Sequence, residues 1–236
     1  IGIVAAGAIA KKILREKAGV EIIAYVSQIK DLAFKADVDF GNISALKDKI
    51  EANPVRVPDA ELADKMVRLI QDTRQAGDSL GGIVECAAVG VPAGWGDPVF
   101  DRLDALIARA MLAIPATKGI ESGSGFSSVT MTGSEHNDIF EMQNGKVATK
   151  TNYSGGIQGG ISNGMPITFR VAFKPTATIS KEQPSVNENG EDVMLKVKGR
   201  HDPCVLPRAV PIVEAMLALV LVDQFMIAQT AQYDRL

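Results

Sequence analysis

Apolar positions recur along this chain with two spacings, and together they predict alternating helices and strands. Spacings of three and four residues predict helices over residues 3–17, 45–50, 59–77, 99–113 and 209–230. Unbroken apolar runs rich in β-branched residues predict strands over residues 20–29, 83–91, 167–173 and 193–197.

Local signals mark where some of these elements begin and end. Gly19 is typical of a helix C-terminus, and Pro58 with Asp59 is typical of a helix start. In the helix expected over residues 99–113, Phe100 falls on the apolar face, so we expect its ring to be buried.

The last helix, over residues 209–230, is the most apolar stretch of the chain. It contains Glu214 and Asp223, which favours a buried helix over a membrane span. A buried carboxylate needs a partner, so we expect Asp223 to pair with an arginine such as Arg208.

Turn-forming residues separate the strands in the second half of the chain. Asn144 and Gly145 predict a hairpin between residues 140–142 and 147–149. A polar turn is expected at residues 187–190, before the strand over residues 193–197.

Residues 155–164 contain five glycines, which indicates either a sharp turn or a close approach to a ligand. The segment lacks the Gly-Lys-Ser/Thr ending of a phosphate-binding loop and does not match the dinucleotide-binding pattern. Both interpretations therefore stay open.

These elements predict an α+β fold in which helices pack against a mainly antiparallel sheet. We find no flexible linker, so residues 1–236 are interpreted as a single domain.

Composition excludes several classes of function. The net charge is −3 and aromatic residues make up 5% of the chain, so we expect neither nucleic-acid binding nor attraction to anionic membranes. Cys86 and Cys204 are too far apart to suggest a disulfide framework or a metal-binding pair, which favours a reducing, cytoplasmic location. His136 and His201 lack the spacing of metal ligands, so no metal site is expected.

Residues 199–204 read Gly-Arg-His-Asp-Pro-Cys and so place a cation, an imidazole, a carboxylate and a thiol close together. Arg200, together with the nearby Arg208, offers donors suited to phosphate or carboxylate. Cys204 lies between a proline and apolar residues, so we expect a buried, unreactive thiol. Another candidate segment reads Lys174, Pro175, Thr176, Ala177 and Thr178, and offers one cation and two hydroxyls at a strand end.

Several segments, in this order, are similar to those of the chorismate synthase family. They are residues 4–12, 77–86, 133–138, 155–164, 173–176 and 199–204. The resemblance implies a layered β-α-β fold of helices and antiparallel sheet.

The resemblance also implies an activity. Members of the family eliminate phosphate from 5-enolpyruvylshikimate 3-phosphate to give chorismate, in the shikimate pathway of aromatic amino acid biosynthesis. They require reduced FMN although the reaction has no net redox change. They are typically homotetramers, and here we expect an external source of reduced flavin because no nicotinamide site is evident.

Matching the family motifs residue by residue assigns roles within this chain. The FMN contacts would fall at the following positions: Pro115, Ala116, Gly159, Lys174, Pro175, Thr176, Ala177, Thr178 and Arg200. Pro115 departs from the polar residue of many members. Asp202 would handle protons near the flavin, and Arg208 would support the bound anion.

The family motifs with two acid histidines and further arginines would lie upstream of Ile1. The chain is accordingly expected to be the C-terminal two-thirds of such an enzyme, and inactive alone. A non-catalytic fragment that binds anions or flavin, or assembles with itself, is the alternative. A nucleotide-binding module built on residues 155–164 is the third possibility.

Overall fold

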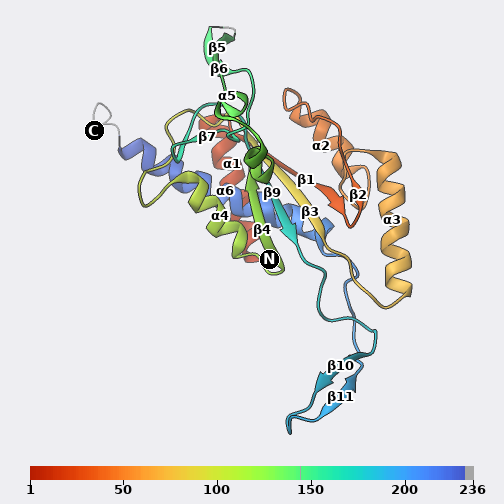
Figure 1. Cartoon of the computed structure of the whole chain (residues 1–236). Helices are drawn as coiled ribbons and strands as arrows, with labels where there is room; N and C mark the ends of the chain where they lie inside the picture. The colour runs from red at the N-terminus through yellow and green to blue at the C-terminus, as the bar shows by residue number, and fades with distance from the viewer. Residues whose placement is uncertain (144, 232–236) are drawn as a thin grey trace.

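A five-stranded antiparallel sheet forms the centre of the molecule (Figure 1). The structure is a computed structural model that describes residues 1–143 and 145–231. The strands lie in the order β2-β1-β3-β9-β4, with bounds Leu32–Ala33, Glu21–Ile29, Gly82–Val89, Ile167–Phe173 and Thr117–Ser122. The predicted α+β class with antiparallel sheet is confirmed.

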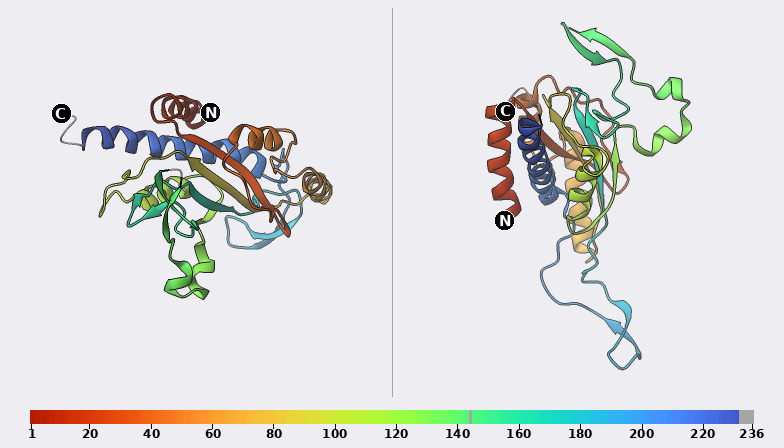
Figure 2. Two further views of the ribbon diagram at one scale, coloured as in Figure 1. Left: turned by 90° about the horizontal axis from the view of Figure 1, so that it is seen from above. Right: turned by 90° about the vertical axis from the view of Figure 1, so that its left-hand side faces the viewer.

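Helices cover both faces of this sheet. Their bounds are α1 Gly2–Ala18, α2 Ile43–Glu51, α3 Ala60–Gln75, α4 Leu103–Leu112 and α6 Leu206–Thr230. Helix α6 lies against one face of the sheet and α1 lies on the outer side of α6 (Figure 2). On the opposite face, α2 buries Ile23 and Tyr25 of β1 beneath Leu46 and Ile50.

The alternation of buried and half-buried residues along β9 shows which face of the sheet packs into the main core. Ile167, Phe169, Val171 and Phe173 are buried in the main core with α6, whereas the residues between them are half-buried on the other face. Side chains point to alternate faces of a strand, so this sequence pattern sets which face receives the helices.

One carboxylate of α6 is half-buried and paired, but it is not the one that the sequence suggested. Glu214 accepts a hydrogen bond of 2.8 Å from the Ala24 N–H and pairs with Lys11 of α1. Asp223 is exposed, and Arg208 pairs with Asp202. The prediction of a buried Asp223–Arg208 pair was therefore wrong, because this side of α6 faces solvent.

The helix starts that differ most from the prediction are those of α4 and α6. Helix α4 begins at Leu103, because Asp97 and Asp101 exchange backbone hydrogen bonds of 2.9 and 2.8 Å that hold the chain in a turn. Phe100 is therefore 95% exposed rather than in the core. Helix α6 begins at Leu206, ahead of the predicted residue 209.

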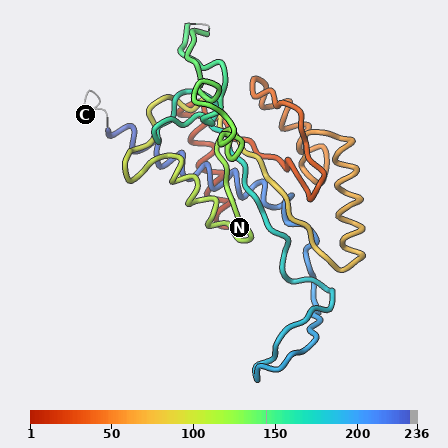
Figure 3. The backbone as a smooth tube through the Cα atoms, viewed as in Figure 1, coloured from red at the N-terminus to blue at the C-terminus, as the bar shows by residue number. Residues whose placement is uncertain are grey.

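The described residues also form three short hairpins, paired as β5 Phe140–Gln143 with β6 Lys146–Thr149, β7 Ile157–Gln158 with β8 Ile161–Ser162, and β10 Gln183–Val186 with β11 Asp192–Leu195. The predicted hairpin at residues 140–149 is confirmed, although Asn144 lies outside the described residues. The turn at residues 187–190 is confirmed, whereas β10 was not predicted. The β10–β11 hairpin projects away from the body (Figure 3).

Helix α6 has the length and apolar composition of a membrane span. It is nevertheless packed between α1 and the sheet, with Leu206, Val213, Leu217 and Leu221 fully buried. Packing of this kind is typical of a core helix.

Candidate active site

The candidate site forms where the chain leaves β9 and where it returns into α6. The Thr176 hydroxyl donates to the Asp202 carbonyl oxygen at 2.9 Å, which joins the departing segment to the returning one. The Lys174 N–H donates to the Ala116 carbonyl oxygen at 2.9 Å, at the start of β4. Three segments that are distant in the sequence therefore meet at one end of the sheet.

The segment before β3 holds these loops together. The Ser79 hydroxyl donates to the Thr176 carbonyl oxygen at 2.7 Å, and the Leu80 N–H donates to the Pro203 carbonyl oxygen at 2.7 Å. A Cβ atom on Gly81 would lie 2.5 Å from the Phe173 carbonyl oxygen, so only glycine allows this approach. Close packing therefore explains the glycine at position 81.

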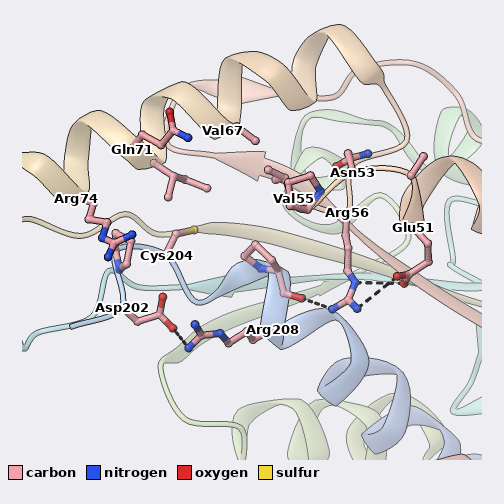
Figure 4. A pocket seen from close by; sticks show the side chains of 15 residues that line it. Glu51, Asn53, Val55, Arg56, Val67, Gln71, Arg74, Asp202, Cys204 and Arg208 are labelled. Carbon is pink, nitrogen blue, oxygen red and sulfur yellow. Dashed lines mark hydrogen bonds and ion pairs between the residues drawn. The ribbon is translucent and has the colours of Figure 1, made fainter. Parts of the chain in front are cut away.

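A cavity of about 680 Å³ opens beside the returning segment, between α3, the loop after α2 and the start of α6 (Figure 4). Val55, Val67 and Ile70 give it apolar walls. A smaller cavity of about 250 Å³ also includes Arg200, and both cavities are lined by Asp202 and other shared residues. The two cavities therefore adjoin.

Positive charge exceeds negative charge around these cavities. Their lining includes four arginines, Arg56, Arg74, Arg200 and Arg208, but only two carboxylates, Glu51 and Asp202. Glu51 pairs with Arg56, and Asp202 with Arg208. Within the described residues, Arg74 and Arg200 have no such partner. The arrangement suits an anion, because guanidinium groups bind phosphate and carboxylate through paired donors.

The structure brings most of the sequence-predicted residues together, but not Gly159. Gly159 is exposed at the β7–β8 turn, and the neighbouring Gly160 carbonyl oxygen accepts from the Leu103 N–H at 2.8 Å, at the first turn of α4. Ala116 follows the last turn of α4, and a helix of ten residues is about 15 Å long. Gly159 therefore lies at the opposite end of α4 from the other predicted residues.

The glycine-rich segment forms a turn between two strands. A phosphate-binding loop instead connects a strand to the N-terminus of a helix. The turn interpretation is therefore favoured over a nucleotide-binding module.

Cys204 and His136 lie in surroundings that suit a structural role rather than a reactive one. Cys204 is buried, and burial raises the pKa of its thiol to about 11, as expected for an unreactive cysteine. His136 lies 2.9 Å from the Ser124 hydroxyl and stacks on Tyr153. Among the described residues, no three His, Cys, Asp or Glu side chains converge as a metal site would require.

Arg56 and Arg74 were not identified from the sequence. Arg74 lies in the last turn of α3, where a cation is expected from the helix dipole alone. Arg56 adopts a left-handed backbone conformation with φ of 64°, which no pattern in the sequence predicted. Only the fold brings both to the cavity, Arg74 from α3 and Arg56 from the loop that reaches the start of α6.

Comparison with known proteins agrees with this geometry. A family model described as chorismate synthase matches residues 1–226. The chain belongs to the chorismate synthase family. A chorismate synthase of Trichormus variabilis is 59% identical over 227 residues, which cover 96% of this chain and 62% of the relative. One of Opitutus terrae is 58% identical over 232 residues, with 98% of this chain and 62% of the relative covered.

A solved structure supports the same relation. A crystal structure of chorismate synthase, 32% identical in sequence, superimposes with a TM-score of 0.81 and covers 96% of this chain and 63% of that chain. The chain thus spans about 62% of the length of the family members it matches.

Proposed function

We propose that this chain provides the reaction site of a chorismate synthase. The reaction is the 1,4-elimination of phosphate from 5-enolpyruvylshikimate 3-phosphate. A C–O bond and a C–H bond break, a double bond forms, and inorganic phosphate and a proton leave. The observation that carries the proposal is the convergence of Ala116, residues 174–178, Arg200 and Asp202 beside an arginine-rich cavity in a member of this family.

The residues at this site fit FMN. Its phosphate would find cations at Lys174 and Arg200, and its ring would lie against residues 115–116 and 174–178, which are half-buried or exposed. The chemistry that reduced FMN would supply when held by these residues is transient electron density for the departure of phosphate. Gly159 would contribute to this cofactor only from the distant β7–β8 turn, so its role stays a prediction.

The remaining side chains orient the substrate and hold the proton. Arg200 and Arg208 offer donors to a phosphate or carboxylate of the substrate. The Asp202 carboxylate is held by Arg208, and its backbone carbonyl by Thr176. These contacts fix its orientation, and at the edge of the proposed cofactor site it would be suited to handle a proton.

The same proposal includes the cellular location, the oligomeric state and the binding partners. The protein would act in the cytoplasm as a homotetramer and receive reduced flavin from an external reductant. It would bind neither nucleic acid nor membrane.

A second candidate is a non-catalytic fragment that binds anions or flavin, or assembles with itself. The observation in its favour is that the chain covers 62% of the length of relatives named chorismate synthase.

An anaerobic assay separates the two candidates. The 236-residue chain, and the Trichormus variabilis relative with its matching 227 residues replaced by this chain, are each given chemically reduced FMN and 5-enolpyruvylshikimate 3-phosphate. We expect chorismate and phosphate in equal amounts from the chimera. Flavin binding without product from a folded chimera would favour the non-catalytic candidate.

A further inference from the structure

The loop between α2 and α3 contains an arginine in an unusual conformation. Arg56 has φ of 64°, a region that residues with a side chain rarely adopt. Its carbonyl oxygen accepts from the Val26 N–H at 2.9 Å, and its N–H donates to the Asn53 carbonyl oxygen at 3.2 Å. Asn53 in turn donates from Nδ2 to the Val57 carbonyl oxygen at 2.7 Å. The loop therefore holds Arg56 in place.

The Arg56 side chain reaches the first turn of α6. Its Nη1 donates to the Pro207 carbonyl oxygen at 2.6 Å, and its Nε lies 3.2 Å from a Glu51 carboxylate oxygen (Figure 4). Glu51 thus orients the guanidinium toward α6.

The Pro207 carbonyl oxygen lacks its normal partner within the helix. In an α-helix, the carbonyl oxygen of a residue accepts from the N–H four residues later. Four residues after Pro207 stands Pro211, which has no N–H. Arg56 supplies the missing donor from a segment 151 residues away in the sequence. A carbonyl oxygen shielded from water is costly to leave unpaired, and this one is partly buried, so the Pro207–Pro211 spacing favours a donor from elsewhere in the chain.

The contact lies next to the candidate site. Arg208 directly follows Pro207 and forms the ion pair with Asp202. Arg56 and Arg208 line the same cavity. Whatever fixes the Pro207 peptide therefore also fixes the backbone from which the Arg208 side chain extends.

We propose that Arg56 is a positioning residue, which replaces the donor lost at Pro211 and thereby sets Arg208 against Asp202 in the anion site. This inference rests on the proposed function for its consequence in cofactor binding, but not for the contact itself. A merely structural Arg56 would change stability and leave anion affinity unaltered.

The test measures FMN affinity and amide hydrogen exchange in the 236-residue chain. Arg56→Met removes the donors, and Arg68→Met is the matched control, because Arg68 is an exposed arginine of α3. We expect Arg56→Met to weaken FMN binding about tenfold, as loss of a charged hydrogen bond at a site would. Arg68→Met should leave the affinity within about twofold. Equal affinities in the two variants would overturn the proposal.

A second substitution distinguishes this mechanism from general damage. Pro211→Ala restores an N–H four residues after Pro207, so Arg56→Met with Pro211→Ala should recover most of the FMN affinity. It should also restore slow exchange at the Ala209 and Val210 amides, which Arg56→Met is expected to accelerate. Failure of Pro211→Ala to restore slow exchange would overturn the proposal.

The exchange measurement keeps the two proposals distinguishable. If the unmodified chain binds no FMN, the role of Arg56 is judged from amide exchange, while the proposed function is judged separately from product formation by the folded chimera.

Discussion

At the scale of single residues, Asp138, in a segment similar to a family motif, serves structure. Its carboxylate is buried and accepts hydrogen bonds from the Thr151 hydroxyl at 2.7 Å and from the N–H groups of Tyr153 and Ser154, each at 2.8 Å. Burial alone would raise the pKa of Asp138, but these hydrogen bonds outweigh it and lower the pKa below its ordinary value.

Asp138→Asn should lower the free energy of unfolding at pH 7 by about 1–3 kcal/mol, because an amide cannot accept all of these hydrogen bonds. A carboxylate with a lowered pKa in the folded state stabilises the fold above its unfolded pKa of about 3.9. That contribution is lost as pH falls through the lower, folded pKa. Urea unfolding between pH 7 and pH 3 should therefore show the difference between the two proteins shrinking below about pH 4. A difference that stays constant with pH would contradict this assignment.

At the scale of elements, the contact between α1 and α6 depends on one glycine. A Cβ atom on Gly7 would lie 2.3 Å from the Ala215 Cβ, which is closer than real carbon atoms approach. Small residues at a helix crossing let the two backbones come together.

Gly7→Ala should lower the free energy of unfolding by about 1–3 kcal/mol through overpacking, although alanine is the better helix former. Gly2→Ala on the same helix is the control, because its Cβ would meet nothing within 4 Å. Thermal unfolding should give a lower midpoint for Gly7→Ala and an unchanged or slightly higher one for Gly2→Ala. Equal midpoints would show that α1 and α6 are not packed as described.

Most elements could be predicted from the sequence because their apolar periodicity is strong. The helix ending at Gly19 and the strand β9 are examples, since caps and alternation are local properties. The start of α4 could not, because a bridge between Asp97 and Asp101 competes with the helix. The strand β10 includes Pro184, which argues against a strand unless it lies in an isolated ribbon.

At the scale of the whole molecule, the site is made by pairing of distant segments. Sequence motifs indicated Lys174, Arg200 and Asp202 because their chemistry is concentrated in short loops. Arg56 could not be found in this way, since its role depends on Pro207, 151 residues later. The distance of Gly159 from the other predicted residues could not be predicted either, because only the fold shows that α4 separates it from Ala116.

We propose that the loops at the end of β9 and before α6 form the reaction site. The decisive experiment compares the initial rate of anaerobic chorismate formation by the chimera carrying Arg200→Gln with that of the Arg68→Gln control. We predict that Arg200→Gln lowers the rate by roughly a hundredfold, as the loss of a charged contact to the reacting anion would, while Arg68→Gln retains the unmodified rate. An Arg200→Gln chimera as fast as the control would contradict the placement of the site.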